Sequence, residues 1–272
     1  MSVAAAYLVS DGVVLGTDSS STVQIQTPHG SGVVQLLTHS QKIFEVGNNS
    51  RIGLCTWGAA SIGNISHRTI AAQLAENITE KTTIEEAATT LVGIVEPKVK
   101  KEKVKFVGYY LGGWNPESHE PACFHLQITQ DISKKEPLSL GLCRFSGNPM
   151  FFTRVFKGYD PQLRTNLLQE LKSSFSGTLP VNFDSIFEKA FEKVSVPLLT
   201  VGFRDLPIRE AIDFVYSYLH LTIKVEKYKF GPPTCGGPIE VAFISTDRLF
   251  RWVSHKPFYS AIIEEESEYG IG

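Results

Sequence analysis

The stretch that decides the fold is SVAAAYLVSDGVVLGTDSSST, residues 2–22. Its apolar runs at 3–9 and 13–17 flank Asp11-Gly12, a dipeptide that is favoured in two-residue hairpin turns. The opening of the chain therefore predicts an antiparallel hairpin. It carries no basic leading segment, so it is not typical of a signal peptide.

Strand-like and helical patterns follow in separate blocks. Apolar residues recur at helical spacing from about 60 to 78, and a second helix is expected from Thr82 or Thr83, with a capping box, to a point before Pro97. The other expected elements are strands at 43–46, 51–56, 104–111, 123–128, 138–145, 239–245 and 249–253 and helices at 161–171, 183–194 and 207–221. Blocks in this order predict an α+β fold with layered sheets.

The composition is that of an ordinary globular chain. Of its 272 residues, 42% are hydrophobic and 20% charged, and the net charge of −2 provides no basic field for nucleic acid. No apolar run reaches the roughly 18 residues that cross a bilayer. Four scattered cysteines without metal-ligand spacing indicate free thiols and a cytoplasmic protein. We expect one domain over 1–272, with a C-terminal extension at about 254–272 that is a tail or an assembly contact, and no cofactor.

The extreme N-terminus offers a nucleophile. Removal of Met1 would leave Ser2 with a free α-amine, whose pKa of about 7.7–8.0 allows it to accept the hydroxyl proton at neutral pH. Many proteins begin with Met-Ser, so this start alone is common. If Asp18 and Lys42 both point inward, Asp18 would hold Lys42 beside Ser2. In the alternative, which spacing alone favours, Asp18 is a turn cap and Lys42 a surface residue.

Several segments in order carry a family resemblance. Residues 2–22 resemble the opening of proteasome β subunits, with Ser2, Gly12 and Asp18 in register without a gap. SQKIFEV resembles the segment that bears the catalytic lysine, here Lys42. CTWGAAS resembles the small-residue turn before the first helix, and CGGPIEVAFIS the junction between the last helix and its strand. On these segments the chain is identified as a member of the proteasome β-subunit-like N-terminal-nucleophile hydrolases, nearest the bacterial homologues of ancestral β-subunit type.

The resemblance implies a four-layer α/β/β/α sandwich of two antiparallel sheets. It also implies a peptidase or amidase of the threonine-type peptidase family, acting on peptide or protein substrates and self-associating into a ring or stack; an ATP-dependent unfoldase partner stays unknown. The implied catalytic residues are Ser2, Asp18, Lys42 and Gly58, with the backbone N–H groups at Trp57-Gly58 facing the oxyanion. The implied substrate-binding residues are Ser21, Thr22, Phe44, Cys55, Trp57 and Ala59.

The chain departs from the family pattern in four places. Serine replaces threonine, a short insertion lies near Gln26–Val34, and the supporting acid and serine fall on Pro232 and Cys235. Trp57 occupies a glycine position, where its indole either fills the cleft or packs at a sheet edge.

Two other functional classes stay open. One is a non-catalytic proteasome-like scaffold or assembly protein. The other is a metal-dependent hydrolase at the run 117–120, whose single histidine, His119, is more typical of a solvated loop.

Overall fold

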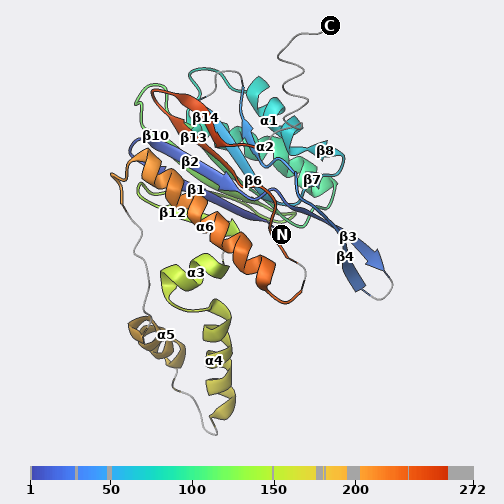
Figure 1. The fold of residues 1–272 in the computed structure, drawn as a ribbon, viewed down its shortest axis with the longest axis vertical. Coiled ribbons are helices and arrows are strands. Elements are labelled where there is room, and N and C mark those ends of the chain that lie inside the picture. Colours follow the sequence, from blue (N-terminus) through green and yellow to red (C-terminus); the bar gives the residue numbers. More distant parts are fainter. Residues whose placement is uncertain are drawn as a thin grey trace.

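The computed structural model describes residues 2–27, 30–47, 51–148, 150–175, 180, 182–194, 203–231 and 233–256. Its main body contains two five-stranded antiparallel sheets (Figure 1). In spatial order, the first sheet consists of β12 (Cys143–Gly147), β1 (Val3–Val9), β2 (Gly12–Thr17), β13 (Glu240–Ser245) and β14 (Leu249–Ser254). The second consists of β11 (Ser133–Pro137), β10 (Pro121–Ile128), β9 (Val107–Trp114), β6 (Ile52–Gly58) and β5 (Ile43–Glu45).

Helices cover the outer face of each sheet. Those of the second sheet are α1 (His67–Glu76) and α2 (Ile84–Lys101), and those of the first are α6 (Ile208–Tyr228) and α3 (Met150–Lys157). The inner faces of the two sheets pack on each other through a third apolar cluster that includes Leu15, Cys55 and Tyr110. The four-layer α/β/β/α sandwich expected from the sequence is therefore confirmed.

Smaller elements extend from this body. Two short hairpins, β3 (Ser21–Thr27) with β4 (Gly30–Leu37) and β7 (Ser61–Ile62) with β8 (Ile65–Ser66), lie outside the main sheets, and the first contains the expected insertion. Helices α4 (Pro161–Ser174) and α5 (Phe183–Val194) project away from the sandwich (Figure 1). Within the described ranges, no helix has the length and apolarity that a membrane span requires. Residues 257–272, which make up most of the expected C-terminal extension, lie outside these ranges.

The first hairpin forms as expected, but its turn lies one residue earlier. Val9 pairs with Gly12, so Ser10 and Asp11 occupy the turn and Gly12 begins the second strand. A Cβ on Gly12 would lie 2.1 Å from the carbonyl oxygen of Ile244 in the neighbouring strand. The glycine is therefore required both by its φ of 153° and by the close approach of β13.

Helix α2 begins at the expected capping box, formed by Thr83 and Glu86, but the prediction that it ends before Pro97 is wrong. Proline removes only the hydrogen bond to residue 93 and clashes with that residue's carbonyl. The helix continues because Val95 and Val99 bury completely against the second sheet. Burial on both sides of the proline outweighs its local cost.

Two strand predictions also needed correction. The expected strand at 138–145 forms only from Cys143, as β12, while β11 over Ser133–Pro137 was missed. The sequence of β11, SKKEP, carries charges because it is the edge strand of its sheet and most of it faces solvent. Because its residues are mostly polar, they show none of the apolar alternation that predicts a strand.

We expect Gly147→Ala to lower the free energy of unfolding by at least about 2 kcal/mol, measured by denaturant titration. Gly147 has a φ of 85°, and a Cβ there would lie 1.9 Å from the carbonyl oxygen of Ser2. The matched control is Gly93→Ala in α2, where a Cβ meets nothing within 4 Å. There alanine should stabilise the protein by about 1 kcal/mol. Equal effects of the two substitutions would contradict this account.

Candidate functional site

Three of the expected catalytic residues lie at the ends of neighbouring strands. Ser2 directly precedes β1, Asp18 directly follows β2, and Lys42 directly precedes β5. Pairing of Ala4 with Thr17 brings the first two ends together within the first sheet. Lys42 belongs to the second sheet, where its carbonyl accepts a hydrogen bond from the N–H of Thr56 in β6. Stacking of the two sheets then brings the Lys42 side chain to Ser2 and Asp18.

The side chains of these three residues form one buried cluster. The ammonium group of Lys42 donates hydrogen bonds to Ser2 Oγ at 2.9 Å and to Asp18 Oδ1 at 2.7 Å. Ser2, Asp18 and Lys42 are only 6%, 0% and 5% exposed. Lys42 is therefore not a surface residue. Asp18 does cap the turn that follows it, by accepting a hydrogen bond from the Ser20 N–H, but it also pairs with Lys42.

Asp18 is surrounded by hydrogen-bond donors. Its Oδ1 accepts from the Val3 N–H at 3.1 Å, and its Oδ2 accepts from the Gly236 N–H at 3.0 Å. Ser20 donates to Oδ2 twice, from its hydroxyl at 2.5 Å and from its N–H at 3.2 Å. With Lys42, these donors replace the water that a buried carboxylate loses, so Asp18 has the partners of an ionised group.

The end of β6 lies beside the chain segment that carries Lys42. Thr56 donates its N–H to Lys42 on the β5 side, and Ala59 donates its N–H to the Phe106 carbonyl on the β9 side. Because backbone N–H groups alternate along a strand, the N–H of Gly58 faces the β5 side and that of Trp57 faces β9. Gly58 has a φ of 93°, in the region that favours glycine.

Two of the expected substrate-binding side chains lie in the core between the sheets. The Trp57 indole stacks on the His125 ring at 5.3 Å and lies 4.5 Å from the Tyr110 ring. The indole thus packs in the interior and does not fill a cleft. Cys55 is fully buried, and burial raises the pKa of its thiol well above the usual range.

The other expected substrate-binding residues occupy separate positions. Ser21 and Thr22 begin β3 and pair with Leu37 and Leu36 of β4. Ala59 is half-buried, and its carbonyl lies 2.8 Å from Nε2 of His67.

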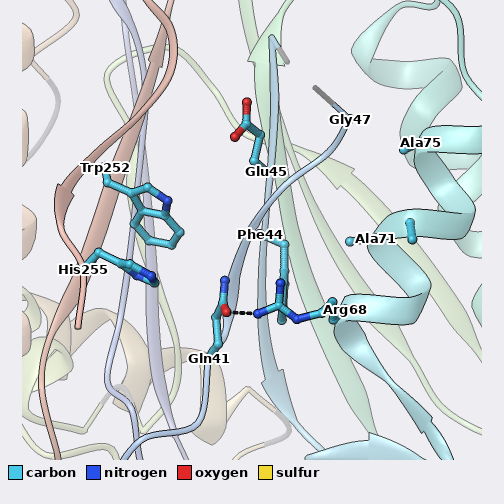
Figure 2. A pocket seen from close by; sticks show the side chains of 10 residues that line it. Gln41, Phe44, Glu45, Gly47, Arg68, Ala71, Ala75, Trp252 and His255 are labelled. Atoms are coloured by element: carbon cyan, nitrogen blue, oxygen red, sulfur yellow. Dashed lines mark hydrogen bonds between the residues drawn. The ribbon is translucent and has the colours of Figure 1, made fainter. Parts of the chain in front are cut away.

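Phe44 is buried beneath α1 and lines a pocket of about 520 Å³, as does Gln41, the residue before Lys42 in the chain (Figure 2). The Arg68 guanidinium lies 5.7 Å from the centre of the Phe44 ring and bonds to the Gln41 side chain. Trp252 and His255, from β14 and the residues after it, form the opposite wall. The pocket therefore opens between the edge strands of the two sheets.

Several polar residues at the cluster were missed in the sequence. Ser20, Glu240 and Lys256 are all buried there. A glutamate inside the apolar run PIEVAFIS was the one available signal. The position that replaces the supporting acid, Pro232, lies outside the described residues. Cys235 is buried, and burial raises the pKa of its thiol to about 12, so it is protonated at neutral pH.

A metal site finds no support in the described part of the chain, where no group of three or more His, Cys, Asp and Glu residues has the arrangement to hold an ion. His119, the candidate from the sequence, instead stacks on Trp114 at 5.6 Å.

The fold and the cluster together define an α/β/β/α sandwich with a buried Ser–Lys–Asp group at the start of its first strand. Solved structures with this fold include the following two. One is the helical assembly of the Anbu complex from Pseudomonas aeruginosa, with a TM-score of 0.53 and 11% identity over 98% of this chain and 93% of that one. The other is a mutant of Anbu from Hyphomicrobium sp. strain MC1, with a TM-score of 0.52 and 11% identity over 100% and 98%.

These comparisons correct the family assignment made from the sequence. No protein-family model and no curated protein matches the chain. The two similar structures named above are of Anbu rather than of a proteasome β subunit, and 11% identity shows the fold alone. Membership of the proteasome β-subunit-like family is therefore wrong. The short segments that suggested it indicated the fold but not the family.

Asp18→Asn should destabilise the protein by about 3–5 kcal/mol in denaturant titrations, because the substitution leaves Lys42 as an uncompensated buried charge. Asp184→Asn provides the matched control, since Asp184 bridges Lys172 at 2.7 Å on the surface and is 63% exposed. That change should cost less than about 1 kcal/mol. A small effect of Asp18→Asn would mean that Lys42 is stable without its partner.

Proposed function

We propose that the chain is a hydrolase of peptide or amide bonds whose nucleophile is the hydroxyl of Ser2, exposed as the first residue when Met1 is removed. The observation that carries this proposal is the 2.9 Å contact between Ser2 Oγ and the ammonium group of Lys42. A fixed cation beside a serine hydroxyl favours its deprotonated form. The cation is itself held in place by the buried carboxylate of Asp18.

The reaction would be acyl transfer in two steps. Ser2 Oγ attacks the substrate carbonyl carbon while its proton passes to the α-amine of the same residue, directly or through water. The amine then gives this proton to the leaving nitrogen as the C–N bond breaks, which leaves an ester on Ser2. Water hydrolyses the ester by the same route. Lys42 would stabilise the developing charge on Oγ, and we assign the Gly58 N–H to the oxyanion.

The substrate would bind as an extended peptide. We assign one side of its backbone to Ser21-Thr22 and the other to Gly58-Ala59, in the manner of an added strand. Among the proposed substrate-binding residues, Phe44 lines the pocket between α1 and β14. We therefore assign it to contact with a substrate side chain. Since Cys55 and Trp57 point into the core, they support this surface from behind rather than by contact.

Incubation with a fluorophosphonate probe should label the wild-type protein at Ser2, with the site identified by intact mass and peptide mapping. Ser2→Ala should abolish labelling, because the hydroxyl is lost. Ser2→Thr should retain it, because the hydroxyl and the α-amine both remain. Lys42→Met should slow it by roughly 100-fold, as expected for the loss of one electrostatic stabiliser.

Ser10→Ala on the same hairpin is the control, since Ser10 lies at the exposed turn, and it should label like the wild type. The same intact-mass measurement reports whether Met1 has been removed. A native protein that retains Met1, or that has lost it and still resists the probe, would argue for the non-catalytic scaffold instead.

We also propose that the chain self-associates. The Pseudomonas aeruginosa protein with the same fold is described as a helical assembly, and the chains match over nearly their full lengths. Light scattering coupled to size exclusion should give a mass well above the 30.1 kDa of one chain at micromolar concentration. A monomer throughout that range would contradict this prediction.

A further inference from the structure

We infer that Glu240 and Lys256 form a second buried ion pair that positions Asp18 and Lys42 for the reaction of Ser2. This inference rests on the proposed function of Ser2 and adds to it two positioning residues from the C-terminal part of the chain. In this pair, Lys256 Nζ lies 3.0 Å from Glu240 Oε1. Both residues are buried, Glu240 completely.

Glu240 contacts the backbone that carries the catalytic lysine. It is the first residue of β13 and pairs with Thr17, the residue before Asp18. Its Oε2 accepts a hydrogen bond from the main-chain N–H of Lys42 at 3.4 Å. Its Oε1 is shared by Lys256 and by Nδ1 of His255 at 2.9 Å. One carboxylate therefore links β13 to the start of β5.

Lys256 joins the two catalytic segments directly. Its ammonium group donates to Ser19 Oγ at 3.1 Å and to the Ser40 carbonyl at 2.9 Å. Ser19 follows Asp18, and Ser40 precedes Lys42 by two residues. The backbone N–H of Ser40 also donates a hydrogen bond to the Ser19 carbonyl at 2.9 Å. Glu240 Oε1, at 3.0 Å, is the ion-pair partner of the same ammonium group.

The four charges act on one another as a unit. Burial lowers the pKa of Lys256, and the hydrogen bond and charge of Glu240 oppose that shift. The charge of Lys42 lowers this pKa further, while that of Asp18 raises it. Two carboxylates and two ammonium groups thus share one buried region, so removal of either member of the second pair changes the field at the first.

Stability alone is a poor explanation for such a pair. A buried ion pair loses so much hydration that apolar residues of similar volume are often equally stable there. Apolar residues, however, form no directional hydrogen bonds, so they could not replace the bond to the Ser40 carbonyl or the bond from the Lys42 N–H. The pair is therefore best explained by the geometry that it imposes, and replacing it with an apolar pair separates geometry from stability.

The test compares wild type with the double variant Glu240→Leu/Lys256→Met. The matched control is Glu85→Leu/Lys135→Met, at a surface pair separated by 3.1 Å. Three properties are measured: the thermal midpoint of unfolding, the rate of fluorophosphonate labelling at Ser2, and hydrogen exchange in the segments 17–22 and 38–46. We expect the Glu240/Lys256 variant to stay folded, to label roughly 10–100-fold more slowly, and to exchange faster in both segments. The control should match wild type in all three.

The outcomes separate this inference from the proposed function. If wild type does not label, the proposed function fails, and the exchange measurement still decides whether the pair positions the two segments. A folded double variant with wild-type labelling or wild-type exchange in both segments would overturn the inference. The conservative variant Lys256→Arg keeps the charge and should recover at least part of the labelling rate. If the double variant does not fold, Ser19→Ala, which removes one acceptor of the Lys256 ammonium group, decides on the same two measurements. Wild-type labelling and exchange in this variant would then count against positioning.

Discussion

The contact between Lys42 and Asp18 is the interaction on which the rest of the site depends. Removing a carboxylate and an ammonium group from water costs several kcal/mol each, and their attraction offsets this only when the remaining lone pairs and protons are satisfied. Asp18 meets that condition through donors from Val3, Ser20 and Gly236 as well as Lys42. These donors belong to β1, to the chain after β2, to the loop before β13 and to the start of β5. The Lys42–Asp18 pair is therefore stable only when both sheets are stacked. The site thus forms in the same step as the packing of the two sheets.

Most of the fold was accessible from the sequence because its helices and inner strands bury regular apolar patterns. The apolar runs in residues 2–22 and the capping box at Thr83 are local signals, and the structure follows them. The helical spacing from about 60 to 78 is followed only in part, because residues 61–66 form the hairpin of β7 and β8 and α1 begins at His67. The errors arise where a tertiary contact outweighs a local rule. Pro97 stays inside α2 because the residues on either side of it bury on the sheet, and β11 is polar because it lies at an edge. Neither fact is visible without knowing which elements are neighbours.

The site was predictable only in part, for a related reason. Ser2, Asp18 and Lys42 lie at strand ends, and strand ends can be located from apolar runs. By contrast, the inward direction of Cys55 and Trp57 depends on the register of β6, which a single sequence does not fix. Glu240 and Lys256 are harder still, since their partners lie about two hundred residues earlier in the chain. Segments that match a family in order can thus recover the fold while giving the wrong family, because strand ends and glycine contacts are properties of the fold itself.

The balance of charge around Ser2 explains why such a buried group can exist at all. Asp18 and Glu240 carry the negative charges, Lys42 and Lys256 the positive ones, and each ammonium group lies within 3.0 Å of one carboxylate oxygen. The charges of these four side chains therefore cancel, so their burial costs far less than that of a lone ion. Within it, Lys42 still has a donor directed at Ser2 Oγ. A negative charge that develops on that oxygen meets a cation whose position is already fixed, and no side chain has to reorganise to stabilise it.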